Sequence, residues 1–328
     1  MRRFATFVLD TAFGLLGRAA HVVFHLFGWR FISFTGKLSG DIVYLLNRRK
    51  RTETAEEIRL LFGARFGEER IKGITRRSFE NYYRRQVETV FFGSLDRETI
   101  ERIIRCEGRE NLDGALEKGK GVILLLSHFG SFLLPLPYLG FMGYRVDQVT
   151  GRQIHASLAG ERFWEWRKRE AEKLPVRFLQ VGRFLRPLYQ ALGRNETVAI
   201  AFDGRDGSRW AVVDFFGRKA RFSTGPFELA RRTGAAIIPT FVVREADNTH
   251  RIVLEPPFEL SDDEDTERAL AEDTRRFAGI FSRYIGEYPC HFGAVLYIMK
   301  KMRDSGIKKP LFVESYGYCS DNTNTTGH

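Results

Sequence analysis

Apolar residues follow a helical spacing early in the chain and then gather in short runs. Between residues 54 and 92, apolar positions such as Ile58, Leu61 and Phe62 recur at three- and four-residue steps, which predicts helices. After Gly108 the pattern changes to short apolar runs separated by longer helical segments. Short strands that alternate with helices are typical of an α/β fold.

The α/β region divides into a series of predicted elements. Strands are predicted at 122–126, 144–149, 176–179, 197–202, 211–215, 235–243 and 251–254, and helices at 132–142, 156–173, 183–192, 226–233 and 266–288. Acidic residues at 261–265 precede the last helix, at the end where the helix dipole favours carboxylates. The pattern therefore predicts one α/β domain over residues 53–305, with a mixed central sheet flanked by helices.

Residues 4–34 are mostly apolar, but charges interrupt them. Asp10 and Arg18 break the apolar runs, whereas a membrane-spanning helix needs roughly 20 consecutive apolar residues. Aromatic side chains cluster at the end of the stretch, and the basic run 48–51 follows. This composition favours a helical region, residues 1–52, that lies in a membrane interface and attracts anionic lipid. A buried pair of amphipathic helices is the alternative.

Composition limits the classes of protein and partner. The 328 residues are 43% hydrophobic, enough for a sizeable core, whereas residues 306–328 end in a polar segment that predicts a disordered tail. The net charge of +11 favours nucleic acid, an anionic membrane or a phosphorylated ligand, but no nucleic-acid-binding motif accompanies it. Cys106, Cys290 and Cys319 have neither zinc-site nor disulfide spacing. We therefore expect no metal, no nucleic acid and a reducing, cytosol-facing location.

His128 stands where the apolar strand 122–126 gives way to a glycine turn at Gly130. Imidazole titrates near neutral pH, so a histidine held at the carboxyl end of a buried strand can accept a proton from a substrate hydroxyl. A histidine that only caps a turn is the alternative reading of the same pattern.

Two further segments could bind an anion. The loop 203–207 follows a predicted strand and carries Arg205. Thr224 and Gly225 precede Pro226 at the predicted start of a helix, with Ser223 or Thr224 as its N-cap. Ligands gather at the carboxyl ends of strands, and helix N-termini offer free N–H groups to anions. An ordinary capped helix is the alternative for the second segment.

Several of these segments, taken in order, resemble the lipid A late acyltransferases. The matching segments are 121–134, 144–152, 192–217, 224–235 and 239–244, within a resemblance that spans about residues 1–300. The resemblance implies a glycerolipid-acyltransferase-like fold with membrane-contacting N-terminal helices. It further implies an enzyme on the cytoplasmic face of a bacterial inner membrane. Such an enzyme moves a fatty acyl group from acyl carrier protein or coenzyme A thioester to a lipid or glycolipid hydroxyl, without a cofactor.

The chain departs from the superfamily signature, a histidine followed five positions later by an acid. Leu133 stands in the place of that acid, so a carboxylate that orients His128 must come from elsewhere. Asp203 and Asp206 are candidates, because their loop should emerge at the same edge of the sheet. The predicted catalytic residues are His128 and Asp203, and the predicted substrate-binding residues are Ser131, Arg152, Arg205, Thr224 and Gly225. A catalytically altered member that binds lipid or assists assembly is the alternative.

Overall fold

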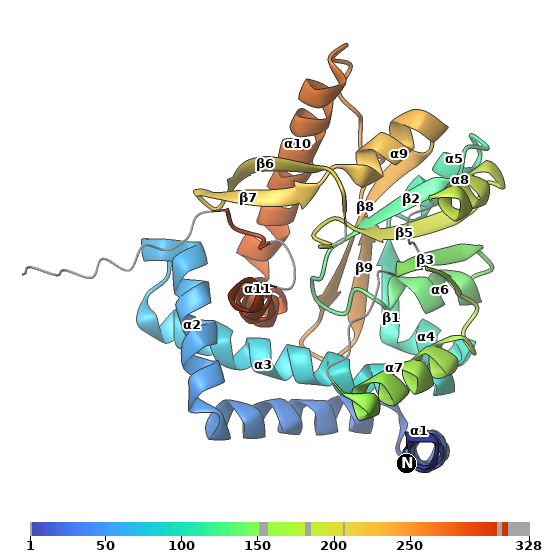
Figure 1. The fold of residues 1–328 in the computed structure, drawn as a ribbon, viewed down its shortest axis with the longest axis vertical. Helices are drawn as coiled ribbons and strands as arrows, with labels where there is room; N and C mark the ends of the chain where they lie inside the picture. The colour runs from blue at the N-terminus through green and yellow to red at the C-terminus, as the bar shows by residue number, and fades with distance from the viewer. Residues whose placement is uncertain (1, 151–156, 181–184, 206, 307–309, 314–328) are drawn as a thin grey trace, which may run out of the picture.

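A computed structural model describes residues 2–150, 157–180, 185–205, 207–306 and 310–313. Its strands are β1 (Ile104–Glu107), β2 (Val122–Leu126), β3 (Val146–Thr150), β4 (Arg177–Gln180), β5 (Thr197–Ala201), β6 (Trp210–Phe215), β7 (Arg218–Ser223), β8 (Ala236–Arg244) and β9 (His250–Leu254). Seven of them form a central sheet in the order β1-β9-β8-β2-β5-β3-β4, and β6 and β7 form a separate hairpin (Figure 1). Neighbouring strands in the central sheet are parallel except β8 and β9. The predicted mixed sheet is confirmed.

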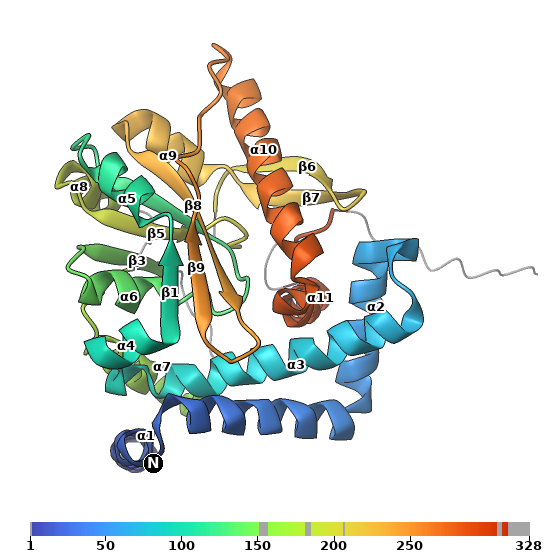
Figure 2. The same cartoon turned by 180° about the vertical axis from the view of Figure 1, so that it is seen from behind.

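Helices cover both faces of the sheet (Figures 1 and 2). They are α1 (Arg2–Leu46), α2 (Arg48–Phe62), α3 (Glu68–Val90), α4 (Arg97–Ile103), α5 (Arg109–Leu116), α6 (Pro135–Phe141), α7 (Leu158–Ala171), α8 (Arg186–Gly193), α9 (Gly225–Thr233), α10 (Thr266–Glu287) and α11 (Gly293–Ser305). Ile123 and Leu125 of β2 enter one hydrophobic core with α8 to α11, whereas Val122, Leu124 and Leu126 enter a second core with α4 and α6. This alternation follows from the two-residue period of a strand and buries β2 on both sides.

Helix α1 turns sharply at Gly28, whose φ of 70° and ψ of 178° are not helical. Beyond the turn it runs beside α3 (Figure 1). The two backbones are so close that a Cβ on Gly36 would lie 2.5 Å from the Cα of Arg84. The exposed large apolar side chains of α1 are Phe7, Val8, Leu15, Leu16, Val22, Leu26, Phe27, Phe31, Phe34, Leu38, Ile42, Leu45 and Leu46. Residues 5–46 are long and apolar enough to cross a membrane, and 11% of the most apolar window is buried in the chain.

The predicted elements mostly match the observed ones to within a few residues, and Asp265 caps α10 as its acidic start predicts. Strands β1 and β7 and helices α4, α5 and α11 were not predicted. Within the predicted disordered tail, residues 310–313 pack on the protein. Leu311 is buried, and its carbonyl accepts a hydrogen bond from the Arg221 N–H on β7 at 2.7 Å. The rest of the predicted tail beyond Val313 lies outside the described residues.

Candidate active site

The carboxyl ends of β2 and β5 bring His128 and Asp203 together. The two strands are parallel, and their register pairs Leu126 with Ala201. The Phe202 N–H then donates to the Leu126 carbonyl at 2.8 Å, which continues the pairing past the strands. His128 and Asp203 each follow two residues after the last paired position. They are therefore neighbours at one edge of the sheet, as the sequence predicted.

Asp203 binds both the ring and the backbone of His128. One carboxylate oxygen lies 2.9 Å from His128 Nδ1 and 3.0 Å from the His128 backbone nitrogen, and the other lies 3.2 Å from that nitrogen. The carboxylate is fully buried, whereas 37% of the His128 side chain is exposed. Burial raises the pKa of Asp203, but the charge and hydrogen bonds of His128 outweigh it, so the pKa lies below the usual 3.8. Asp203 is therefore held as an anion at the Nδ1 edge of the imidazole ring.

This arrangement leaves the second ring nitrogen available. A carboxylate at Nδ1 favours the tautomer with its proton on Nδ1, which places the free lone pair on Nε2. In the part of the chain that the structure describes, Nε2 makes no hydrogen bond. A partly exposed imidazole with a buried carboxylate behind it has the arrangement of a general base.

The loop after His128 is fixed by contacts with distant segments. Gly130 has a φ of 57°, and a Cβ there would lie 2.2 Å from the Val242 carbonyl oxygen, so only glycine fits. The Gly130 N–H donates to the His291 carbonyl at 3.1 Å, and the Phe129 ring stacks on the His291 ring. Ser131, predicted to bind substrate, is buried, and its hydroxyl lies 3.2 Å from the Arg244 guanidinium.

Arg205 lies in the predicted loop, but its guanidinium contacts the protein itself. It donates to the backbone carbonyls of Asp203 at 3.0 Å, Arg221 at 2.9 Å and Pro310 at 3.3 Å. Burial lowers its pKa to about 10. These bonds tie the Asp203 loop to β7 and to the segment after α11. Arg205 therefore positions Asp203, and its predicted contact with a substrate anion stays a prediction.

The other predicted binding residues are only partly described. Thr224 occupies the N-cap position of α9 and Pro226 lies in its first turn, as predicted. The Thr224 hydroxyl does not cap the helix, and this buried group has no hydrogen-bond partner among the described residues. The Gly225 N–H lies 3.4 Å from the Ser223 hydroxyl. Arg152 and Asp206 lie outside the described residues.

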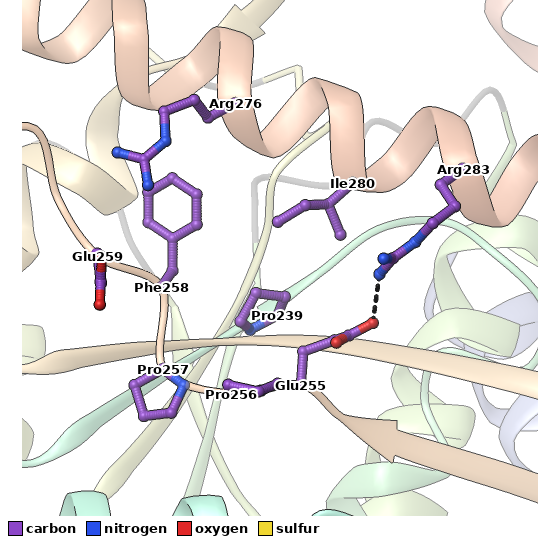
Figure 3. A pocket seen from close by; sticks show the side chains of 9 residues that line it. All are labelled: Pro239, Glu255, Pro256, Pro257, Phe258, Glu259, Arg276, Ile280 and Arg283. Carbon is purple, nitrogen blue, oxygen red and sulfur yellow. Dashed lines mark hydrogen bonds and ion pairs between the residues drawn. The ribbon is translucent and has the colours of Figure 1, made fainter.

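A surface pocket of about 320 Å³ lies between the end of β9 and α10 (Figure 3). Glu255 and Arg283 form an ion pair of 2.6 Å on its wall, and the guanidinium of Arg276 lies over the Phe258 ring. Neither His128 nor Asp203 lines this pocket. We place the candidate site at the His128–Asp203 edge instead, because that edge carries a proton-accepting pair. Within the described residues, no cluster of histidine, cysteine and acidic side chains could hold a metal ion.

Four residues near the site escaped the sequence analysis: Arg85, Glu88, Arg244 and His291. They come from α3, β8 and the turn before α11, so no local spacing connects them to His128. The segment around His291 forms one wall of the His128 loop.

Comparisons with known proteins show the family to which the chain belongs. Residues 3–292 match the family model described as bacterial lipid A biosynthesis acyltransferase. A phosphatidylinositol mannoside acyltransferase of Mycobacterium tuberculosis is 33% identical over 50% of this chain and 51% of its own length. The lipid A biosynthesis palmitoleoyltransferase of Escherichia coli is 25% identical over 70% of this chain and 73% of its own.

The similarity to the mycobacterial proteins covers only part of each chain. The corresponding protein of Mycolicibacterium smegmatis is 27% identical over 53% of this chain and 57% of its own. The chain thus spans about half the length of the mycobacterial relatives that it matches. The family model extends much further, from the start of α1 to the turn after His291. This chain belongs to the bacterial lipid A biosynthesis acyltransferase family.

Proposed function

We propose that this protein is a membrane-associated acyltransferase that moves a fatty acyl group from a carrier thioester to a hydroxyl of a lipid or glycolipid. The observation that carries the proposal is the contact of His128 with the buried carboxylate of Asp203 at the carboxyl edge of the sheet. The family and the names of the relatives, which act on lipid A or phosphatidylinositol mannoside, support acyl transfer to a lipid acceptor.

In the proposed reaction His128 acts as the general base. Its Nε2 accepts the proton of the acceptor hydroxyl while the hydroxyl oxygen attacks the thioester carbonyl carbon. The tetrahedral intermediate collapses with cleavage of the carbon–sulfur bond, and the imidazolium returns its proton to the departing thiolate. The products are an ester and a free thiol. Asp203 stabilises the imidazolium through Nδ1, in the role that an orienting carboxylate has in other histidine-based sites.

The apolar surface of α1 supports a location at a membrane. Leu26, Phe27 and Phe34 are each more than half exposed, beside the turn at Gly28. An apolar helix surface of this extent is stable only against lipid or another apolar surface. We place the protein at the cytoplasmic face of the bacterial inner membrane, where a water-soluble carrier thioester and a membrane lipid can both reach His128.

A catalytically altered protein that binds lipid is the second candidate, and Leu133 is the observation that favours it. The acid that the superfamily places five residues after the histidine is absent. Asp203 weakens this candidate, because a carboxylate already contacts His128 Nδ1. We therefore favour the enzyme.

The test combines purified full-length protein with vesicles that contain a lipid A precursor or a phosphatidylinositol mannoside. Acyl carrier protein thioesters and coenzyme A thioesters serve as donors, and mass spectrometry follows the acylated lipid. We expect transfer with at least one pair, and a loss of about 10²-fold or more for His128→Ala. His25→Ala, which removes an exposed imidazole from α1, is the control and should retain activity. No transfer with any pair, or full activity of His128→Ala, would contradict the proposal.

A further inference from the structure

Arg85 on α3 is a half-buried cation next to the His128 loop. Its guanidinium donates to the Gly130 carbonyl at 3.0 Å and lies 5.2 Å from the centre of the Phe132 ring. The Phe132 ring is 4.8 Å from the His128 ring. One aromatic ring therefore links Arg85 to the proposed base, and the single hydrogen bond to Gly130 leaves most of the five guanidinium N–H donors for other partners.

Arg167 on α7 is the second cation of this region. Helix α7 lies beside the C-terminal end of α3 in both views (Figures 1 and 2). Bonds of 2.8 and 2.7 Å from Arg162 to Asp10 and packing of Phe163 on Phe13 fix α7 to the N-terminal half of α1. Arg167 is also half-buried, and its positive charge acts on Arg85. The segments that carry these two cations, the C-terminal part of α3 and helix α7, are thus neighbours (Figures 1 and 2).

The charge of this region is not balanced within the described residues. Neither Arg85 nor Arg167 forms an ion pair there, whereas the buried Arg244 pairs with Glu88. The carboxylates of Glu88 and Asp203 also act on the charge of Arg85. Glu88, however, forms an ion pair with Arg244, and Asp203 pairs with His128. Burial lowers the pKa of Arg85 to about 10 and also lowers that of Arg167. Two poorly hydrated cations on neighbouring helices, without ion-pair partners among the described residues, cost folding free energy unless an anion binds them both.

We propose that Arg85 and Arg167 form a binding site for a phosphate ester of the substrate, next to the His128 base. This site rests on the proposed function and specifies how that function selects its substrates. Guanidinium groups bind phosphate oxygens through pairs of parallel hydrogen bonds, and a phosphate supplies the negative charge that the region lacks. Both substrates of the proposed reaction can carry such a group: the phosphopantetheine arm of the donor, or the headgroup of the lipid acceptor.

The proposal is tested by binding rather than turnover, in a His128→Ala background that forms no product. For the donor, S-acyl phosphopantetheine is compared with S-acyl pantetheine, which lacks the phosphate. For the acceptor, vesicles with phosphatidylinositol are compared with vesicles of the same acyl composition that contain diacylglycerol instead. Arg85→Gln, Arg85→Lys and Arg167→Gln are measured against Arg77→Gln. Arg77 lies exposed on α3, about two turns before Arg85, so its loss changes the net charge equally.

We expect the parent to bind one phosphate-bearing probe at least about tenfold more tightly than its phosphate-free partner, since a hydrogen bond to a charged group contributes about 1.5–3 kcal/mol. Arg85→Gln and Arg167→Gln should abolish that preference, Arg85→Lys should restore part of it, and Arg77→Gln should retain it. If the variants lose the preference for S-acyl phosphopantetheine over S-acyl pantetheine, the site binds the phosphate of the donor. If they lose the preference for phosphatidylinositol vesicles over diacylglycerol vesicles, the site binds the headgroup of the acceptor lipid. The phosphate site would be refuted if Arg85→Gln and Arg167→Gln kept both the melting temperature and the phosphate preference of the parent with both pairs of probes. The outcome does not depend on whether His128 is the base.

Should Arg85→Gln fail to fold, Arg167→Gln still decides the matter. Arg167 makes no hydrogen bond or ion pair within the described residues, only distant contacts with the Phe163 and Trp164 rings, so its replacement by glutamine breaks no polar contact of the fold. A preference that Arg167→Gln leaves unchanged, together with Arg85 variants that only lower the melting temperature, would assign Arg85 to holding Gly130 and would refute the paired site.

Discussion

Glu88 on α3 and Arg244 at the end of β8 form a bidentate ion pair that is almost completely buried. The two hydrogen bonds measure 2.8 and 2.7 Å, and 1% of the Glu88 side chain and 4% of the Arg244 side chain are exposed. The Arg244 guanidinium also reaches the hydroxyls of Ser33 on α1 and Ser131 in the His128 loop. One cation thus connects the apolar N-terminal helix, α3, the sheet and the candidate active site.

Removal of one partner of this ion pair should lower the stability of the protein far more than removal of both. We expect Glu88→Gln to lower the free energy of unfolding by about 3–5 kcal/mol, because it leaves a buried Arg244 charge without its counter-ion. The double variant Glu88→Gln, Arg244→Met should recover much of that loss. Urea unfolding of both variants measures the difference. Equal stability of the single and double variants would show that the two charges are not coupled.

Asp203→Asn tests whether the carboxylate, rather than the shape of the pair, supports catalysis. The amide keeps the size of the side chain but cannot stabilise the imidazolium through Nδ1. By analogy with the same change in a serine protease triad, the expected loss in kcat is about 10⁴-fold. Asp214→Asn on β6 is the matched control, because that carboxylate is 74% exposed and pairs with Lys219 at the surface. A turnover number for Asp203→Asn close to that of Asp214→Asn would remove Asp203 from the mechanism.

The sequence could predict the His128–Asp203 contact because both residues follow strands. Parallel strands end at one edge of a sheet, so two strand ends in an α/β pattern are candidates for neighbours without any knowledge of distance. The strand order, which places β5 next to β2, was not available from the pattern. Arg205 shows the limit of the same reasoning. Its position after a strand end was correct, but the carbonyls of Arg221 and Pro310 that bind it come from remote segments.

The contacts of Arg85, Glu88 and Arg244 could not be predicted for a related reason. Arg85 and Glu88 lie in α3, and the amphipathic pattern of the sequence predicts this helix. The pattern does not show which of its charged residues face the protein interior, because that depends on the angle at which α3 crosses the sheet. That crossing is set by close packing on α1 at Gly36 and Gly40, over sequence separations of about forty residues. Spacing within a single element carries no information on such contacts.

Leu133→Glu should not improve the enzyme, although it restores the superfamily signature. Asp203 already occupies Nδ1 of His128, so a new acid could reach only Nε2, the nitrogen that must accept the proton. Leu133 packs against the second hydrophobic core, where a carboxylate loses hydration. We expect no gain in kcat and a loss of about 1–3 kcal/mol in the free energy of unfolding. An increase in kcat would mean that Asp203 does not replace the missing acid. Leu133→Met is the control for size.

Membrane binding should depend on the exposed aromatic side chains next to the turn in α1. Burial of one phenylalanine side chain contributes about 1.5–3 kcal/mol, so the triple change of Phe27, Phe31 and Phe34 to serine should weaken vesicle binding by well over tenfold. Sedimentation with vesicles of anionic and neutral lipid measures the effect. Binding by the triple variant that equals the parent's at both low and high salt would show that this surface does not contact lipid.

Acid should destabilise the protein through His291. This buried imidazole accepts a hydrogen bond from the Arg244 N–H through Nε2 at 2.9 Å, and burial lowers its pKa from 6.5 to about 3. The folded state keeps the ring neutral between pH 6.5 and 3, whereas the unfolded chain takes up a proton there. Stability should therefore fall as the pH drops below 6.5, by roughly 1.4 kcal/mol per pH unit for this residue.

His291→Gln separates this contribution from those of other groups, because the amide can keep an acceptor near the Arg244 N–H without titrating. Between pH 7.5 and 5.5 the wild-type protein should lose about 1.4 kcal/mol more stability than the variant. Urea unfolding at the two pH values gives both differences. His250 is also buried, and its pKa lies far below 6.5, so it too should make the protein less stable in acid. The His291→Gln variant still contains His250 and should keep this second loss of stability. Parallel pH profiles for the two proteins would mean that the His291 pKa is the same in the folded and unfolded chains, and that its ring is not held neutral against the loop of His128.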